Sequence, residues 1–261
     1  MKILALDFDG VIVNSINDAL VTSFNTYVKF YKYTELFGGK RIELNNFKEM
    51  PNKFPDEAKK FKELKVYAGC ADEFVGIFMA IDENVKIKNQ KEFDEFKESI
   101  PEEKKKEFSK AFYEERYALQ KDMSSWNKLT LPFEKIIDGV KKLIKKNKIC
   151  FITNKDKRTI IMLFKRFGIK LGPDVIWDKD AGIDKAEKLI KLADKFKTKP
   201  KDILFVEDIL AHLLKVKPLG ITCFLATWGV NNKKQRKEAQ EKGIILLSQD
   251  NFYGMLKDRL I

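Results

Sequence analysis

Two aspartates near the start of the chain have the spacing of a catalytic carboxylate pair. Asp7 and Asp9 stand one residue apart in the stretch LDFDG, directly after an apolar run that begins at Ile3. Two acids at this spacing place their side chains on the same side of an extended segment, within reach of one reacting atom. One carboxylate can act as a nucleophile, while the second protonates the leaving group and then activates water. The pattern predicts a division of labour between attack and proton transfer.

Two later apolar runs also lead to polar residues. The run ICFIT ends at Thr153 and is followed by Asn154, and the run ILFVE ends at Glu207 and is followed by Asp208. The carboxyl ends of parallel strands meet at one edge of a sheet, where ligands of open α/β sheets bind. We therefore expect these four residues to gather around Asp7.

Carboxylates that converge in this way need a counter-charge. Each pair about 4 Å apart repels by roughly 4 kcal/mol at an effective dielectric constant of about 20, which demands either proton uptake or a cation. The expected ligands are oxygens, with no cluster of histidine or cysteine, and this favours Mg²⁺ over zinc. The usual task of such an ion beside carboxylates is to hold a phosphate.

The elements that must position these residues alternate between strands and helices. Buried strands are predicted at residues 2–7, 149–153, 203–207 and 221–226, and helical patterns precede the later ones, as in FEKIIDGVKKLIKKN and DKAEKLIKLADKF. This alternation indicates right-handed βαβ units. We predict an α/β fold with a doubly wound, Rossmann-like parallel sheet.

A long interval separates the first strand from the others. Residues 15–131 show mostly helical patterns, and Ser15 with Asp18 three residues later predicts a capping-box variant at the start of the first helix. Pro132 closes the interval. We expect a catalytic core made of residues 1–14 and 132–261, and a mainly α-helical cap domain at 15–131.

Composition limits the classes of partner. The net charge of +12 comes mostly from lysine and forms no arginine-rich stripe interleaved with aromatic residues, so a mild attraction for anions is favoured over nucleic-acid binding. Three scattered cysteines predict no disulfide framework. The longest strongly apolar stretch, residues 74–81, is too short to cross a membrane. We expect a cytoplasmic protein, and its oligomeric state stays open.

The motifs together resemble those of the haloacid dehalogenase-like (HAD) hydrolase superfamily. The similarity runs in order through DFDGV at 7–11, ITN at 152–154, Lys185 and VED at 206–208. It covers the expected core, and the helical interval stands where that family carries a cap. Asp9 is the acid that phosphoryl-transfer members of the family need and dehalogenases do not.

The resemblance implies a role for each matching residue. Asp7 would be the phosphoryl-accepting nucleophile, and Asp9 the general acid and base, with its backbone carbonyl facing the metal. Thr153, with Asn154 beside it, would bind the phosphoryl oxygens. Lys185 would neutralise the nucleophile and the phosphate, with Lys179 as a competing choice. Asp208 would complete the Mg²⁺ site together with Asp7.

The fourth motif departs from the common family pattern GDxxxD. Glu207 and Asp208 are adjacent, and His212 stands where the second acid would fall. We expect Glu207 to supply the second carboxylate, with water as the alternative. His212 is expected to be a structural residue or to contact a metal ligand, in preference to binding the metal itself.

In the cap, Arg41 and Arg116 are candidate contacts for an anionic substrate, with a place in a turn or on a helix surface as the alternative. The sequence predicts a Mg²⁺-dependent phosphatase of a small phosphorylated metabolite, working through an aspartyl phosphate on Asp7. A phosphomutase of the same fold and a non-catalytic phosphate-binding regulatory protein remain as alternatives.

Overall fold

The computed structural model of this chain describes residues 1–260. They divide into two compact units. The core unit holds residues 1–14 and the chain from residue 132 onward, and the helical unit holds residues 15–131. Each unit has its own buried apolar residues.

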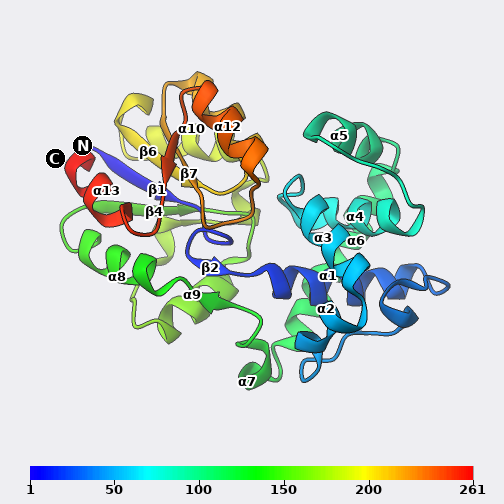
Figure 1. The fold of residues 1–261 in the computed structure, drawn as a ribbon. Helices are drawn as coiled ribbons and strands as arrows, with labels where there is room; N and C mark the ends of the chain where they lie inside the picture. Colours follow the sequence, from blue (N-terminus) through cyan, green and yellow to red (C-terminus); the bar gives the residue numbers. More distant parts are fainter. Residues whose placement is uncertain (261) are drawn as a thin grey trace. The chain divides into compact units, whose positions relative to one another are not determined.

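The core unit is built on a six-stranded sheet in which all neighbouring strands are parallel. This arrangement confirms the predicted α/β fold (Figure 1). Two short edge strands, β5 (Ile176–Trp177) and β8 (Ile245–Leu247), are not predicted by the sequence. In sheet order the strands are β5 (Ile176–Trp177), β4 (Lys148–Ile152), β1 (Ile3–Leu6), β6 (Ile203–Glu207), β7 (Thr222–Ala226) and β8 (Ile245–Leu247).

Helices cover both faces of this sheet, as a doubly wound fold requires (Figure 1). Both layers lie on strands whose side chains are almost fully buried. One layer is formed by α10 (Lys185–Lys195), α11 (Leu210–Val216) and α12 (Lys233–Glu241), and the other by α8 (Glu134–Leu143), α9 (Lys157–Arg166) and α13 (Phe252–Leu260).

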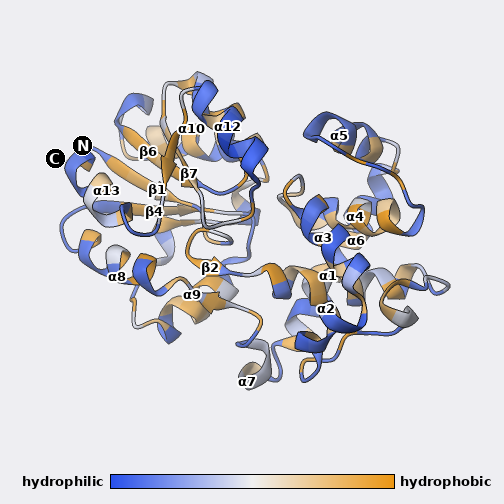
Figure 2. Cartoon of the chain, in the orientation of Figure 1, coloured by the Kyte–Doolittle hydropathy of each residue, from blue (hydrophilic) through white to orange (hydrophobic). Residues whose placement is uncertain are grey.

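Strand side chains alternate between the two layers. Ala5 and Cys150 belong to the apolar cluster that includes residues of α10 and α11, whereas Phe151 packs on Phe164 of α9 with ring centroids 4.6 Å apart. The strands of the core are accordingly apolar along their length in Figure 2. Full burial of a large apolar side chain contributes about 1.5–3 kcal/mol, so the sheet is a rigid support for the loops at its edge.

The helical unit contains seven α-helices within the described chain. They are α1 (Ile16–Phe30), α2 (Met50–Lys53), α3 (Pro55–Lys65), α4 (Phe74–Asp82), α5 (Gln90–Glu98), α6 (Glu102–Leu119) and α7 (Met123–Trp126). Helix α1 packs against α4 and α6, and α3 packs against α4. Outside the main sheet, two short strands, β2 (Val13–Asn14) and β3 (Leu131–Pro132), pair with each other, and of their residues only Leu131 is counted in the helical unit.

Short 3₁₀ helices complete the elements of both units. In the helical unit they lie at Leu36–Gly39, Phe47–Glu49 and Ala71–Glu73, and in the core unit at Pro173–Val175, Lys179–Ala181, Pro200–Asp202 and Lys217–Leu219.

Aromatic side chains form the centre of the helical unit. Phe78 of α4 lies 5.5 Å from Phe24 of α1 and 5.6 Å from Phe61 of α3, measured between ring centroids. The apolar stretch of residues 74–81 therefore serves as a buried helix. Among residues 1–260, no helix is long and apolar enough to cross a membrane.

The predicted capping box at the start of α1 is wrong. Ser15 occupies the cap position, but its side chain makes no capping hydrogen bond. The Asp18 carboxylate faces the interior instead, where it accepts hydrogen bonds from Thr22 and Trp126. A buried carboxylate needs such donors, and these outweigh the local attraction of the helix start.

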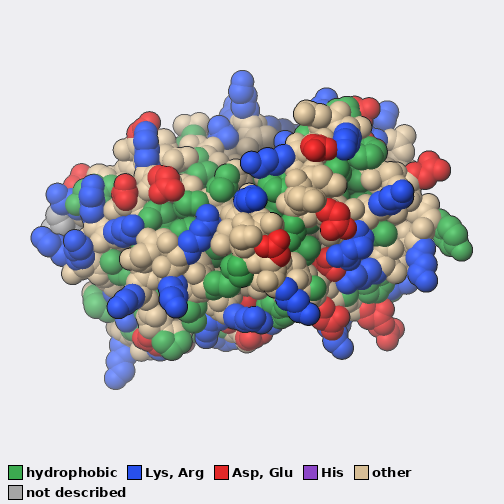
Figure 3. Space-filling view, turned by 90° about the horizontal axis from the view of Figure 1, so that it is seen from below, with side chains coloured by type: hydrophobic (Ala, Val, Ile, Leu, Met, Phe, Trp, Pro, Cys, Tyr) green, Lys and Arg blue, Asp and Glu red, His purple; other side chains and the backbone are tan. Residues whose placement is uncertain are grey.

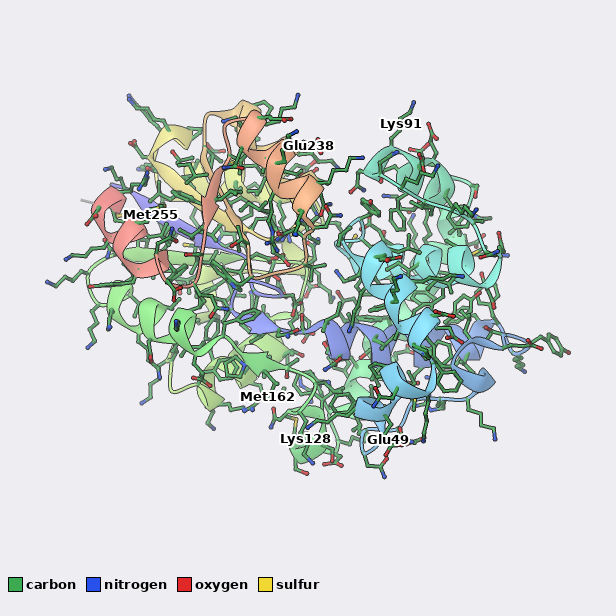
Figure 4. All side chains as sticks on the ribbon, viewed as in Figure 1. Glu49, Lys91, Lys128, Met162, Glu238 and Met255 are labelled. Carbon is green, nitrogen blue, oxygen red and sulfur yellow. The ribbon has the colours of Figure 1, made fainter. Side chains whose placement is uncertain are left out.

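Charged side chains occupy the surface of both units. On the face shown in Figure 3, basic groups lie scattered among acidic and apolar ones and form no continuous stripe. Lys91 on α5 points away from its ribbon in Figure 4, and its side chain is 85% exposed although it lies 3.6 Å from Glu95. Such exposed pairs contribute at most about 1 kcal/mol.

Candidate active site

The carboxyl ends of three adjacent strands place the acidic residues together. Strand β1 lies between β4 and β6 in parallel register, with Leu6 opposite both Phe151 and Val206. The chain leaves all three strands at the same level of the sheet. Asp7 follows β1, while Glu207 ends β6 and precedes Asp208. Each of these three acids offers an oxygen within 4.8 Å of the others.

Asp7 has one oxygen held in place and one left open. Its Oδ2 lies 2.9 Å from the Lys185 Nζ atom, and its Oδ1 is buried and has no hydrogen-bond partner within residues 1–260. Burial and the charge of Glu207 raise the pKa of Asp7 to about 7, although Lys185 partly opposes them. A buried oxygen without a partner is costly, and here it points to a ligand that supplies the missing interaction.

Glu207 is the most fully bonded of the acids. Its Oε1 accepts the backbone N–H groups of Asp208 and Ile209 at 2.9 and 3.0 Å. Its Oε2 accepts the Lys185 ammonium and lies 3.1 Å from the His212 Nδ1 atom. Burial raises the pKa of Glu207, but Lys185 and His212 outweigh burial, so the pKa lies well below its usual range. Each oxygen has two partners, which uses most of the acceptor capacity of a carboxylate.

Asp208 is held by the segment that follows β7. Its Oδ2 accepts the Val230 N–H group at 2.6 Å, and its backbone carbonyl accepts a hydrogen bond from the Asn231 side chain at 3.1 Å. Burial, followed by the charges of Glu207 and Asp7, raises the pKa of Asp208 well above its usual value.

Two glycines make room for Asp208. A Cβ atom on Gly10 would lie 1.8 Å from the Asp208 Oδ2 atom, and one on Gly229 would lie 2.3 Å from the Asp208 Cβ atom. Gly10 also has a φ angle of +76°, a left-handed conformation that disfavours side chains. These positions admit only glycine without displacement of the acid.

Asp9 is paired with a lysine that the sequence analysis did not single out. The Lys155 Nζ atom lies 3.0 Å from Asp9 Oδ1 and 3.3 Å from Asp9 Oδ2. The Lys155 side chain is fully buried, whereas the Asp9 side chain is 35% exposed. One side of the Asp9 carboxylate is therefore open to solvent, while the other side contacts a buried ammonium group.

The loop after β4 is anchored by a second unpredicted lysine. Lys188 on α10 is fully buried and donates hydrogen bonds to the Thr153 carbonyl at 2.6 Å and to Asn154 Oδ1 at 2.8 Å. The Thr153 hydroxyl accepts the Lys155 N–H group at 3.2 Å. A hydroxyl that accepts from the backbone keeps its own proton to donate, so Thr153 can donate to a phosphoryl oxygen.

Composition alone does not identify Lys155 and Lys188 as site residues, because the chain has 51 lysines and arginines in total and most of them face solvent. Position does carry a signal. Lys155 directly follows Thr153 and Asn154, and Lys188 comes three residues after Lys185, on the same face of a helix. Of the two lysines that the sequence proposes beside Asp7, Lys185 makes the contact, while Lys179 pairs with Asp180.

The two arginines proposed for substrate binding both pair with acids inside the helical unit. Arg116 is only 5% exposed, contacts Asp18 at 2.9 Å and lies over the Phe112 ring. Arg41, which is 41% exposed, contacts Glu115 through both terminal nitrogens. The burial of Arg116 favours a structural role within the unit over contact with a substrate.

The acidic cluster suits a hard divalent cation. It offers carboxylate oxygens alone for this purpose, which Mg²⁺ prefers. The open Oδ1 atom of Asp7 and the raised pKa values of Asp7 and Asp208 mark a shortage of positive charge. Without a cation, the shortage would be met by protons.

Comparison with known families agrees with this geometry. The sequence model of the haloacid dehalogenase-like hydrolase family, whose members are described as hydrolases, matches residues 1–214 of this chain. A comparison with proteins of curated function finds no significant match.

Solved structures share the fold across nearly the whole chain. A predicted phosphatase from Clostridium acetobutylicum matches with a TM-score of 0.64 and 11% identity, covering 98% of each chain. A predicted phosphoglycolate phosphatase from Haemophilus somnus matches with a TM-score of 0.61 and 17% identity, again covering 98% of each chain. A β-phosphoglucomutase from Clostridium difficile has a TM-score of 0.57 and 16% identity, covering 100% of this chain and 97% of its own. At these identities the likeness concerns the fold alone.

Proposed function

This chain belongs to the haloacid dehalogenase-like hydrolase family, and from that premise we propose that it is a Mg²⁺-dependent phosphatase of a small phosphorylated metabolite. The observation that carries the proposal is the state of Asp7. Its Oδ2 is fixed by Lys185, while its buried Oδ1 has no hydrogen-bond partner among the described residues. A nucleophile that is oriented at one oxygen and unsatisfied at the other is prepared for a phosphoryl ligand.

The proposed reaction has two steps, transfer of the phosphoryl group to Asp7 and its hydrolysis. An Asp7 oxygen forms a bond to phosphorus while the bond from phosphorus to the leaving oxygen breaks, and Asp9 gives its proton to that oxygen. Asp9, now ionised, then takes a proton from water as the water oxygen attacks phosphorus. Cleavage of the aspartyl phosphate releases inorganic phosphate and restores the Asp7 carboxylate.

Residues of two segments, the loop after β4 and the start of α10, bind the transferred group. The Thr153 hydroxyl donates to a phosphoryl oxygen, and Asn154 lies beside it. Lys185 balances the charge of Asp7 and of the phosphate, since its ammonium contacts both Asp7 and Glu207. Positive charge fixed before the reaction stabilises the transition state at no cost of reorganisation.

Asp7 and Asp208 would hold the metal, with the backbone carbonyl of Asp9. When bound, Mg²⁺ supplies positive charge that offsets the repulsion among the carboxylates and polarises the phosphate. Glu207 belongs to the same cluster, but its two oxygens already have four partners. We therefore assign it the task of positioning Lys185 and Asp208, in place of the direct ligand role expected from the sequence.

The helical unit is proposed to act as the cap. It is inserted at residues 15–131, directly after the loop that carries both catalytic aspartates. A cap excludes bulk water and selects the substrate by its leaving group. Arg41 is the cap residue that we propose for contact with an anionic group, because it is 41% exposed. Arg116 is left out because it is buried in an ion pair.

The test is an assay of phosphate release from a panel of phosphorylated metabolites, with Mg²⁺ or with EDTA. The wild type is compared with Asp7→Asn and with Asp250→Asn, which removes an exposed acid paired with Lys135. We expect turnover only with Mg²⁺, in the wild type and in Asp250→Asn. Turnover in EDTA, or full activity of Asp7→Asn, contradicts the proposal. Conversion of a sugar phosphate to its isomer without release of phosphate identifies a phosphomutase instead.

A further inference from the structure

The loop after β4 carries a residue whose geometry points to a task in the reaction. We propose that Lys155 is a positioning residue, which holds the Asp9 carboxyl group in place for proton transfer to the leaving group. This inference rests on the proposed function, in which Asp9 is the acid. It starts from the two contacts of Lys155 Nζ with the Asp9 oxygens, at 3.0 and 3.3 Å.

The two partners of this ion pair differ in exposure, and the difference shows which side chain holds the other in place. The Lys155 side chain is fully buried and the Asp9 side chain is 35% exposed. A buried ammonium is strongly disfavoured without an anion beside it. The buried partner is therefore the fixed one, and it limits the side-chain rotation of the more exposed acid.

Lys155 is itself anchored at its backbone. Its N–H group donates to the Thr153 hydroxyl at 3.2 Å, and the Thr153 carbonyl accepts from the buried Lys188 at 2.6 Å. The Lys155–Asp9 pair thus joins the loop after β1, which carries the acid, to the loop after β4, which is proposed to bind the phosphate. A fixed distance between those loops keeps the acid aligned with the bond that breaks.

Lys155 Nζ lies within hydrogen-bond distance of both Asp9 oxygens, so one oxygen can stay bonded to the ammonium while the other carries the proton that is transferred. That proton passes to the departing oxygen as the bond from phosphorus to this oxygen breaks, and Lys155 keeps all of its own protons. In this proposal the ammonium group acts through Asp9, so its removal harms the reaction most when the leaving group needs a proton.

This dependence on the leaving group supplies the test. Glycerol 2-phosphate releases an alkoxide that must be protonated, whereas p-nitrophenyl phosphate releases a stable anion. For Lys155→Met we expect kcat/KM with glycerol 2-phosphate to fall roughly 10- to 100-fold, because general acid catalysis contributes about 10²- to 10⁴-fold. With p-nitrophenyl phosphate we expect a fall of no more than about 3-fold, since departure of that anion needs no acid.

Three further variants separate positioning from structure. Lys65→Met removes a buried lysine of the helical unit, whose Nζ donates to the Ala68 carbonyl, and it should leave the ratio of the two kcat/KM values unchanged. Lys155→Gln, which keeps a donor without the charge, should lower the ratio less than Lys155→Met and carries the test if the methionine variant does not fold. In an Asp9→Asn background, Lys155→Met should have no further effect on the ratio.

The outcomes distinguish this inference from the function on which it rests. An equal loss with both substrates, or no loss with either, overturns the role of Lys155 while the wild type remains an active phosphatase. A wild type that, in the presence of Mg²⁺, hydrolyses neither of these substrates nor any compound of the metabolite panel overturns the proposed function, and this inference with it. A selective loss with glycerol 2-phosphate supports the positioning role.

Discussion

In the helical unit the buried Glu115 carboxylate faces Lys29 and both terminal nitrogens of Arg41, whereas in the core unit the buried Asp7 shares the single ammonium of Lys185 with Glu207. Burial alone raises the pKa of either acid. At Glu115 the hydrogen bonds and charges of Arg41 and Lys29 outweigh burial, and the pKa lies below its usual value. At Asp7 burial and the charge of Glu207 outweigh the effect of Lys185, and the pKa rises to about 7.

The same contrast holds for the other buried acids. Asp18 in the helical unit is bonded by Arg116, Trp126 and Thr22, whereas Asp208 in the core unit has a raised pKa because of burial and two neighbouring acids. Matched buried charges hold a unit together, and breaking such a pair is expensive. Unmatched ones destabilise the fold and persist where a ligand completes them. The balance of charge around a buried acid therefore separates structural acids from functional ones.

The largest expected effect is that of Asp7→Asn. Turnover should fall by at least about 10³-fold, as expected when a covalent nucleophile is removed. In EDTA the free energy of unfolding should rise by about 1 kcal/mol, because the substitution removes charge repulsion at a functional site. Phosphate release and urea unfolding measure the two quantities. A loss of stability in this variant would place Asp7 among the matched, structural acids and remove the contrast.

Arg116→Met should have the opposite effect on stability. It leaves Asp18 buried without its guanidinium partner, and breaking a buried ion pair costs about 3–5 kcal/mol. Urea unfolding followed by circular dichroism checks this. Lys29→Met serves as the control, because Lys29 is 47% exposed and Glu115 keeps both of its contacts with Arg41, so a smaller loss of stability is expected. Equal effects of the two substitutions would argue against the structural role of the buried pair.

The pH dependence of stability tests the core unit directly. Asp7 has a pKa near 7 in the folded state and an ordinary value of 3.8, so between these values the folded chain binds more protons than the unfolded chain. Stability in EDTA should therefore rise as the pH falls. Between pH 7.5 and pH 5 the gain should be on the order of 2 to 3 kcal/mol, since one pKa unit is worth about 1.4 kcal/mol.

Two comparisons control that measurement. Asp7→Asn should reduce the dependence and leave the part contributed by Asp208, whose pKa is also raised by burial and by its neighbouring acids, and Mg²⁺ should weaken both parts because the ion replaces the proton. Glu207 does not contribute to this slope. Its pKa is lowered from the ordinary value of 4.5, so it changes the balance of bound protons only at lower pH. A slope in the wild type that persists unchanged in Asp7→Asn would assign the titration to another group.

The smallest effect expected is that of Gly229→Ala. The added Cβ atom would lie 2.3 Å from the Cβ atom of Asp208 and must displace that acid. Disturbing the support of a metal ligand typically lowers metal affinity 10- to 100-fold, and we expect about a tenfold rise in the Mg²⁺ concentration for half-maximal activity. Activity at saturating Mg²⁺ should largely recover. Gly254→Ala is the matched control, because nothing lies within 4 Å of that position.

The sequence predicts the structure best where burial and polarity change abruptly along the chain. The apolar runs of β1, β4, β6 and β7 and the polar residues that end them predict the parallel sheet and the place of Asp7, Thr153 and Asp208. The strands β5 (Ile176–Trp177) and β8 (Ile245–Leu247) escape prediction because they have only two and three residues. Segments this short carry no periodic signal.

The partners of the acids could not be predicted from the sequence in the same way. The spacing of Asp18 to Ser15 predicts a helix cap, but the Asp18 carboxylate bonds to Trp126, which lies far along the chain. Lys155 and Lys188 resemble surface lysines until the fold buries them. Ion pairs between distant segments depend on tertiary packing, and neither local spacing nor composition records them.

The position of β1 at the centre of the sheet also bears on how the chain folds. Ile3 pairs with Lys148 on one side and with Ile203 on the other, so both edges of this first strand are completed by segments made much later. At a synthesis rate of about 5–20 residues per second, the wait is on the order of 10 s. The helical unit, whose chain is continuous, can close its own contacts meanwhile. An apolar strand with two open edges is a target for aggregation, so folding assistance should matter most early in synthesis.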